Sequence, residues 1–286
     1  MEKVMHTMDR FSVYVPRLLP EAEPFVSTLR SCPGCGQALA VRIIGKALAN
    51  HGRYPYGCEA PDVSASALPS EGWQTFPPRK ASFAASKIDP AKVLAVAGES
   101  GAFEDLFSLL KDAQGSKKRL FITCFFNEAG IERHGSKPES AYAHDCIRSF
   151  SERLEGIHAI LDRAGSAQPD FFATACASYP FDLIGKVHKA LSCRISFLAV
   201  FVPCPTGCLY DPSLGLHAGR RAVQTGFFPL YQRESGTTSI TLEPGTLLPL
   251  SAYLTMQQAY MVSPEETARV QSLVTGALAA LRKKCP

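Results

Sequence analysis

The chain has 286 residues, 46% of them hydrophobic and 20% charged, a composition typical of globular proteins that excludes disordered, collagen-like and coiled-coil chains. Its net charge of +4 is too small and too dispersed to predict nucleic-acid binding. No apolar run approaches the roughly 18 residues of a membrane span, and the N-terminus lacks the apolar segment of a secretion signal, so we expect a cytoplasmic protein without a membrane anchor.

Helical and strand patterns alternate along the chain. Apolar residues at helical spacing and short apolar runs predict the elements. In chain order we expect a helix over 37–49, a strand over 93–97, a helix over 102–113, a strand over 119–126, a helix over 144–164, a strand over 171–176, a helix over 181–191, a strand over 195–202, a helix over 212–225, a short strand over 237–242 and a helix over 264–282. Strands separated by such helices predict an α/β fold, with a parallel sheet flanked by helices.

One long stretch does not follow this alternation. Residues 54–89 are rich in proline, serine and alanine and show no clear period. We therefore expect this stretch to be a long functional loop or a segment that a partner orders.

The ten cysteines are the first unusual feature of the sequence. Without a signal sequence they should stay reduced, so disulfides are the poorer explanation. Six are set mostly among apolar or small neighbours or near the terminus, which predicts core residues or free thiols. These six are Cys124, Cys146, Cys176, Cys193, Cys208 and Cys285.

The other four cysteines include a closely spaced pair. Cys32 and Cys35 are separated by Pro-Gly, a tight-turn sequence that aims both thiols at one place, and a helix follows them directly. Two ligands do not complete a metal site, and Cys58 and Cys204, each in a predicted turn bounded by glycine or proline, are candidates for the other two. The spacing alone leaves three interpretations open: a metal ion or iron–sulfur cluster, a redox-active dithiol, or structural thiols.

A second motif follows the strand at 93–97. Gly98, Glu99 and Ser100 form a glycine-bounded turn that opens a helix. Backbone N–H groups at such a helix start can hold a phosphate, and a carboxylate there can hold its divalent cation. An ordinary turn between strand and helix is the alternative. Asn127 ends the next predicted strand, and ligands of open parallel sheets sit at the carboxyl ends of strands.

Together these motifs resemble the β subunit of the 2-oxoacid:ferredoxin oxidoreductases, the pyruvate synthase group. The resemblance runs from about residue 30 to the C-terminus, so we expect residues 1–30 to be an N-terminal extension and residues 31–286 to be a single domain of the thiamine diphosphate-enzyme type. The matching segments are Cys32-Pro-Gly-Cys-Gly-Gln-Ala-Leu-Ala-Val-Arg42, Asn127-Glu-Ala129, Gly130-Ile-Glu-Arg133, Ala173-Thr-Ala175, Tyr179-Pro-Phe-Asp-Leu183, Pro203-Cys-Pro-Thr-Gly207, Asp211-Pro-Ser-Leu214, Ala222-Val-Gln-Thr-Gly-Phe-Phe-Pro-Leu-Tyr231, Tyr253-Leu-Thr-Met-Gln257 and Ser263-Pro-Glu-Glu266.

The resemblance implies two cofactors. The family binds a [4Fe–4S] cluster through four cysteines, and the matching positions here are Cys32, Cys35, Cys58 and Cys204. It also binds thiamine diphosphate through Mg²⁺, and the positions that match this site are Gly98, Glu99, Ser100, Asn127 and Ala129.

The thiamine site departs from the family pattern. Glu99 replaces the aspartate that binds Mg²⁺, Ser100 replaces the following glycine, and Phe126 stands where an aspartate is typical. About four residues after Ala129 that supply loop contacts in the family are missing as well. Mg²⁺ demands near-ideal octahedral geometry, so these changes predict weakened thiamine diphosphate binding.

The expected function is that of a β-like subunit in a complex that oxidatively decarboxylates a 2-oxoacid and passes electrons through the cluster to ferredoxin. In the family, the carboxylate that activates the cofactor comes from another subunit or domain. The sequence therefore identifies no catalytic residue, and we expect an α-type partner, with or without γ and δ subunits. The alternative is an iron–sulfur electron-transfer or scaffolding subunit that has lost thiamine diphosphate. A zinc-stabilised structural module is the third interpretation.

Overall fold

The computed structural model describes residues 32–49, 56–59, 92–98, 103–115, 117, 119–129, 150–258 and 262–285, with only the backbone at 49, 56–59, 92–98 and 103–105. The strands are β1 (Tyr56–Glu59), β2 (Lys92–Gly98), β3 (Arg119–Asn127), β4 (Phe171–Cys176), β5 (Ile195–Val202), β6 (Leu230–Glu234) and β7 (Thr237–Leu242). The helices are α1 (Gly36–Ala49), α3 (Phe103–Gln114), α4 (Phe150–Ser166), α5 (Pro180–Ser192), α6 (Pro205–Cys208), the 3₁₀ turn η5 (Pro212–Leu214), α7 (Gly215–Gln224), α8 (Ser251–Leu254) and α9 (Pro264–Lys284).

The strands form one seven-stranded sheet in the order β1-β2-β3-β5-β4-β6-β7. The first five in this order run parallel, which confirms the predicted α/β fold, and β6 and β7 add an antiparallel edge. These two strands form a hairpin whose turn residues Ser235 and Gly236 have φ of 49° and 82°. Positive φ at both turn positions matches the twist of paired strands.

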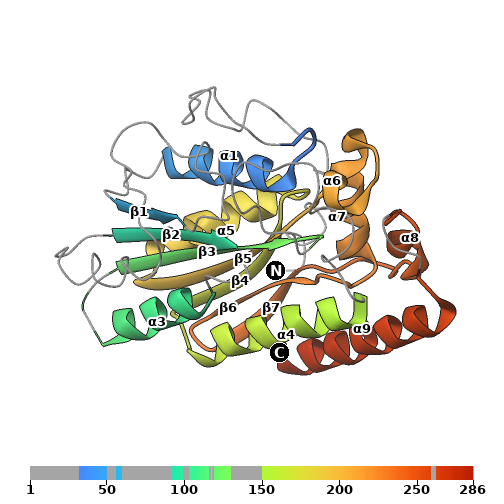
Figure 1. Ribbon diagram of the computed structural model, residues 1–286. Coiled ribbons are helices and arrows are strands. Elements are labelled where there is room, and N and C mark those ends of the chain that lie inside the picture. Colours follow the sequence, from blue (N-terminus) through green and yellow to red (C-terminus); the bar gives the residue numbers. More distant parts are fainter. Residues whose placement is uncertain are drawn as a thin grey trace.

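Helices cover both faces of the sheet (Figure 1): α1 and α5 lie on one face, and α3, α4 and α9 lie on the other. The central strands β3 and β5 are buried along nearly their whole length. Their runs are continuously apolar, as expected for parallel strands covered on both sides.

The chain leaves β3 and β4, the two neighbours of β5 in the sheet, toward opposite faces. After β3 the chain passes to α4 on one face, and after β4 it passes to α5 on the opposite face before returning to β5 (Figure 1). Both connections start at the carboxyl ends of the strands, the edge of an open α/β sheet where ligands bind.

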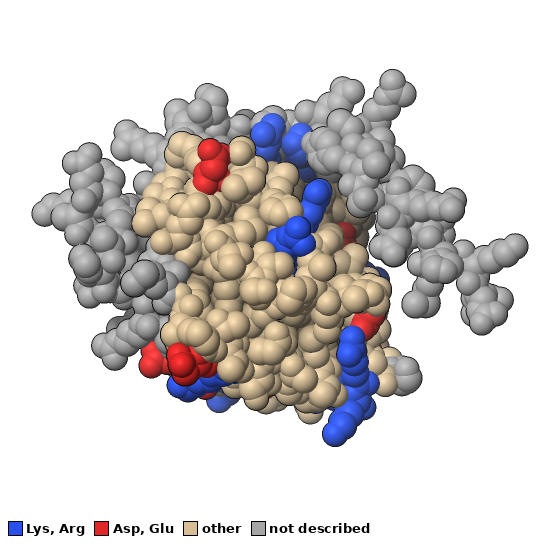
Figure 2. Space-filling model, turned by 90° about the vertical axis from the view of Figure 1, so that its right-hand side faces the viewer, with Lys and Arg blue, Asp and Glu red and all other residues tan. Residues whose placement is uncertain are grey.

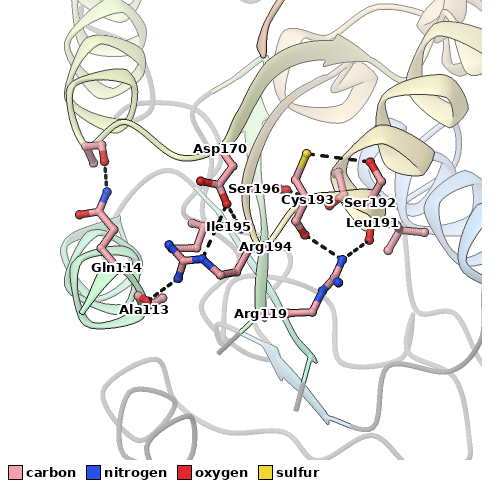
Figure 3. A network of polar contacts seen from close by, with 12 residues as sticks. Ala113, Gln114, Arg119, Asp170, Leu191, Ser192, Cys193, Arg194, Ile195 and Ser196 are labelled. Atoms are coloured by element: carbon pink, nitrogen blue, oxygen red, sulfur yellow. Dashed lines mark hydrogen bonds and ion pairs between the residues drawn. The ribbon is translucent and has the colours of Figure 1, made fainter. Parts of the chain in front are cut away.

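The amino ends of the strands are held by arginine side chains (Figure 3). Arg119 donates to the carbonyl oxygens of Leu191 at 2.7 Å and Cys193 at 3.0 Å, and Arg194 donates to that of Ala113 at 3.1 Å. These contacts tie β3 to the end of α5 and β5 to α3. The polar groups drawn at this edge thus stabilise the fold.

Most predicted elements are confirmed to within a few residues at their ends. The expected helix over 144–164 is observed from Phe150, and residues 144–149 lie outside the described residues. The prediction of no regular structure over 54–89 is wrong at 56–59, which pair with β2 as strand β1. The expected N-terminal extension, residues 1–30, lies outside the described residues. Among the helices that are described, none has the length and apolar character needed to cross a membrane.

Candidate functional site

Three strands end close together at the carboxyl edge of the sheet. Asn127, the last residue of β3, lies opposite Val202, the last residue of β5. Gly98 ends β2 opposite Phe125, two residues before Asn127. The fold thus brings Gly98, Asn127 and the segment after β5 to one edge. Glu99 and Ser100 lie outside the described residues.

The segment from Cys32 to Cys35 forms the predicted tight turn. The backbone N–H of Cys35 donates to the carbonyl oxygen of Cys32 at 3.2 Å, and Gly34 has a φ of +70°. Proline at the second position and a positive φ at the third are the signature of a type II turn. The predicted turn is therefore confirmed, and helix α1 begins directly after it at Gly36.

This turn packs directly against the segments that follow β5. The N–H of Gly36 donates to the carbonyl oxygen of Pro203 at 3.0 Å. A Cβ on Gly36 would lie 2.6 Å from the Pro203 nitrogen, and a Cβ on Gly34 would lie 2.5 Å from the Pro212 carbonyl oxygen. Only glycine permits these approaches, so the two glycines allow three segments that are distant in the sequence to meet.

Cys204 lies at this junction, as the residue that precedes α6. The pKa of its thiol is raised to about 12, mainly by burial and to a lesser extent by the Glu128 carboxylate and the thiols of Cys35 and Cys32. Because Gly36 follows Cys35 and Pro203 precedes Cys204, the hydrogen bond between Gly36 and Pro203 brings the Cys204 backbone next to the Cys32–Cys35 turn. None of the described cysteines, these three among them, forms a disulfide.

The spacing of these thiols bears on the group that they can hold. In the described part of the chain, no three His, Cys, Asp or Glu residues lie close enough together to bind one metal ion. Thiolates on a single zinc lie about 3.8 Å apart, given Zn–S bonds of about 2.3 Å. A [4Fe–4S] cluster binds its cysteines on different irons and accepts a wider spacing. Thiolates bind both zinc and iron–sulfur clusters, so this donor set has the chemistry of either group.

The fourth predicted ligand, Cys58, lies apart from the other three. Its backbone belongs to strand β1 and pairs with Ala95, which in turn pairs with Ile122. Ile122 precedes Asn127 by five residues, or about 16 Å at about 3.3 Å per residue. Cys58 also lies three strands away from β5, or roughly 14 Å. The prediction of a turn at Cys58 is thus wrong, because the backbone of 56–59 pairs with β2.

Cys208 is the fourth thiol that lies close by. It follows Cys204 by one helical turn, its N–H donates to the Cys204 carbonyl oxygen at 3.0 Å, and its side chain is buried. Burial is the main cause that raises the pKa of Cys208 well above its usual value. The described fold therefore brings together Cys32, Cys35, Cys204 and Cys208, and leaves Cys58 separate.

The described residues of the predicted thiamine site are Gly98, of which only the backbone is described, Asn127 and Ala129. The Asn127 side-chain oxygen accepts a hydrogen bond from the Ala129 N–H at 3.0 Å, and Ala129 is fully buried. Arg153 donates to the Asn127 carbonyl oxygen. A carboxamide oxygen has two lone pairs, so Asn127 retains one for a cation. Phe126 is buried against Phe228, with ring centroids 6.0 Å apart, and contributes no ligand.

A buried carboxylate beside these residues was missed from the sequence. Glu128 is 2% exposed, and its side chain accepts hydrogen bonds from the Cys204 N–H at 2.8 Å, the Tyr210 hydroxyl and the Gln257 amide at 2.8 Å. Burial raises the pKa of the Glu128 carboxyl, and these three hydrogen bonds oppose the rise. The family resemblance includes the segment Asn127-Glu128-Ala129 but gives Glu128 no role.

The chain matches no protein-family model. It is 29% identical to pyruvate synthase subunit PorB of Methanocaldococcus jannaschii over 289 residues, a match that covers 89% of this chain and 95% of the relative. It is 25% identical to ketoisovalerate oxidoreductase subunit VorB of Pyrococcus furiosus over 278 residues, which covers 87% and 88%. A solved 2-oxoglutarate:ferredoxin oxidoreductase from Magnetococcus marinus matches 71% of this chain and 82% of its own, with 14% identity and a TM-score of 0.44. The chain is therefore a distant homologue of the PorB and VorB β subunits of 2-oxoacid:ferredoxin oxidoreductases.

Proposed function

We propose that this chain is the β-type subunit of a complex that oxidatively decarboxylates a 2-oxoacid and passes the electrons through a [4Fe–4S] cluster. The observation that supports this most is the contact of the Cys32–Cys35 turn with the Cys204 segment, which depends on Gly34 and Gly36. Three thiols are thereby gathered beside the end of β3. The named activities of the PorB and VorB relatives support the reaction class.

In this proposal Cys32, Cys35 and Cys204 hold the cluster together with a fourth thiolate. A bound cluster would accept electrons one at a time. The sequence resemblance favours Cys58 as the fourth ligand. This assignment requires the 56–59 segment to move toward the Cys32–Cys35 turn and Cys204. Proximity favours Cys208. In a bound cluster, iron would replace the proton of each thiol. The bond to iron would offset the cost of burying the Cys204 thiolate, which is the main cause of its raised pKa.

Gly98, Glu99, Ser100, Asn127 and Ala129 are proposed to hold Mg²⁺ and the diphosphate of thiamine diphosphate. When bound, this cofactor supplies an electron sink for the carbanion of the substrate. Asn127 would contribute its free side-chain lone pair, and Ala129 its carbonyl oxygen. The support is the shared edge at which Gly98 and Asn127 end neighbouring strands.

A second candidate is an electron-transfer or scaffolding subunit that keeps the cluster and has lost thiamine diphosphate. The Asn127 carboxamide is already engaged in its own turn, and the Arg153 guanidinium lies against the Asn127 carbonyl oxygen. A fixed cation so close to the Mg²⁺ position would repel the ion. This observation, and the Glu99 and Ser100 substitutions, favour the second candidate.

The proposed partners are an α-type subunit, with or without γ and δ subunits, and ferredoxin. The end of the molecule over α6, α7 and α8 carries few charged side chains (Figure 2). Leucines are exposed there, with Leu209 61%, Leu214 41% and Leu216 46% exposed. Adjacent apolar side chains on a surface support a protein contact. The proposed location is the cytoplasm, where cysteine thiols stay reduced.

The test is anaerobic purification followed by iron, acid-labile sulfide and zinc analysis. We expect about four iron and four sulfide per chain, and a large loss of both in Cys204→Ser. Cys58→Ser and Cys208→Ser form a matched pair that identifies the fourth ligand, because only one of them should lose the cluster. Zinc without sulfide would overturn the cluster and favour a structural zinc module.

Calorimetric titration with Mg²⁺ and thiamine diphosphate then separates the two candidates. Binding by the iron-loaded protein, alone or with the α-type partner, supports the catalytic β subunit. Absence of binding in both conditions, with the cluster intact, supports the electron-transfer subunit.

A further inference from the structure

Glu128 joins the stretch from Cys204 to Tyr210 and the residue Gln257, which are far from it in the sequence. Its carboxylate accepts hydrogen bonds from the Cys204 segment, from Tyr210 after α6, and from Gln257 after α8. The distances from the Cys204 nitrogen and from the Gln257 amide nitrogen are both 2.8 Å. A buried carboxylate with three donors is strongly oriented, because each hydrogen bond to a charged acceptor restricts it further.

The backbone of Glu128 is fixed as well. Its N–H donates to the carbonyl oxygen of Val202 at 3.0 Å, which ties it to the end of β5. The side chain then reaches the N–H of Cys204, two residues further along the same segment. Both ends of the short connection from Val202 to Cys204 are therefore held by one residue.

The N–H of Cys204 needs such an acceptor. This residue is the N-cap of helix α6. Backbone N–H groups near the start of a helix lack partners within the helix, and a buried N–H without an acceptor costs about 1–3 kcal/mol. The Glu128 carboxylate satisfies this group and thereby sets the direction from which the Cys204 side chain leaves the backbone.

We propose that Glu128 is a positioning residue that holds Cys204 toward the Cys32–Cys35 turn. The inference rests on the proposed function insofar as the thiol binds a cluster. The placement of the Cys204 backbone can be tested without any cluster. Tyr210 and Gln257 assist by fixing the two carboxylate oxygens.

The first test measures hydrogen exchange of the Cys204 amide in the cluster-free full chain, by NMR. In Glu128→Leu this amide loses its acceptor, and we expect exchange to accelerate by roughly tenfold or more, since a hydrogen bond to a charged group contributes about 1.5–3 kcal/mol. Glu128→Gln keeps an acceptor oxygen and should stay close to the wild type. In this variant the side-chain amide of Gln257 can rotate by 180°. Its oxygen, which has no partner in the wild type, then accepts a hydrogen bond from the amide group introduced at position 128. The Leu183 and Thr225 amides, which donate to the carbonyl oxygens of Tyr179 and Arg221 outside this segment, are internal controls.

Tyr210→Phe provides a second variant if Glu128→Leu does not fold. It removes one donor to the oxygen that Cys204 uses, and we expect faster exchange of the Cys204 amide by a smaller factor. Unchanged exchange of this amide in Glu128→Leu, or in Tyr210→Phe where the leucine variant fails to fold, would overturn the positioning role.

The second test is a redox titration of the cluster-loaded protein. Glu128→Gln removes a negative charge beside Cys204, so we expect unchanged iron content and a more positive midpoint potential. A role limited to stability would leave the potential unchanged. If the wild type holds no iron and sulfide, the proposed function fails, whereas the exchange experiment still decides whether Glu128 positions Cys204.

Discussion

The contact between Gly36 and Pro203 can be tested with a single methyl group. A Cβ at residue 36 would lie 2.5 Å from Pro203 Cδ and 2.6 Å from both its nitrogen and its carbonyl oxygen, where ordinary contact begins at 3.4 Å. The Pro203 backbone would have to retreat by 3.4 minus 2.6, or 0.8 Å. This retreat would stretch the 3.0 Å hydrogen bond from the Gly36 N–H and move the Cys204 segment away from Cys35.

The expected cost of Gly36→Ala follows from three contributions. Overpacking costs about 1–3 kcal/mol, and weakening one hydrogen bond costs about 1 kcal/mol. The higher helix propensity of alanine returns up to about 1 kcal/mol. We therefore expect a net loss of about 1–3 kcal/mol, measured by urea unfolding, together with a lower iron content.

Gly276→Ala is the matched control for this substitution. Gly276 lies inside α9, and a Cβ there would meet no atom within 4 Å. We expect this variant to gain up to about 1 kcal/mol and to keep its iron. If Gly36→Ala unfolds at the same urea concentration as the wild type and has the same iron content, close packing of the Cys32–Cys35 turn against Pro203 does not hold the cysteines together.

Three further substitutions test other parts of the structure. Gly226→Ala should cost about 1–3 kcal/mol in urea unfolding, because Gly226 has a φ of +77° and its Cβ would lie 2.4 Å from Leu278 Cδ1; wild-type stability would contradict the packing of α9 there. Burial lowers the pKa of His158 below 6.5, so the unfolded chain binds more protons between the two pKa values and stability should fall as pH drops through this window. His158→Gln should flatten the pH dependence of the free energy of unfolding, and an unchanged slope would assign it to other groups. Leu209 is 61% exposed and has a φ of 55°, so Leu209→Gly should stabilise the fold by about 1 kcal/mol. The same variant should bind the α-type partner more weakly, and unchanged partner affinity would place the interface elsewhere.

The sheet could be predicted mainly where its strands are apolar and covered on both sides. Strands β4 (Phe171–Cys176) and β5 (Ile195–Val202) coincide with the prediction because their apolar runs have clear ends. Strand β6 (Leu230–Glu234) was missed, since its sequence Leu-Tyr-Gln-Arg-Glu is largely polar and only partly buried. Strand β1 (Tyr56–Glu59) is four residues long within a stretch that has no period. Its pairing with β2 is a tertiary interaction without a local signal.

The candidate site shows the same division between local and tertiary information. The Cys32–Cys35 turn could be predicted because proline and glycine specify it locally. The approach of Gly36 to Pro203 could not, because it depends on how α1 packs against the end of β5. The role of Glu128 was hidden for the same reason, since its three donors come from segments that only the fold brings together.

The two candidate cofactor sites share little structure, and this separation bears on the choice between the two proposed functions. The positions of the Cys32–Cys35 turn and of the Cys204 segment depend on α1, on the end of β5 and on Glu128. Glu99 and Ser100, in contrast, follow β2. β2 is separated from β5 by β3. Among the described residues the two sites meet at 127–129, where Glu128 contacts the Cys204 segment and Asn127 and Ala129 belong to the predicted thiamine site. Substitutions after β2 can therefore weaken thiamine diphosphate binding while the contacts that gather the cysteines stay intact, so a subunit that keeps its cluster after losing thiamine diphosphate is structurally consistent.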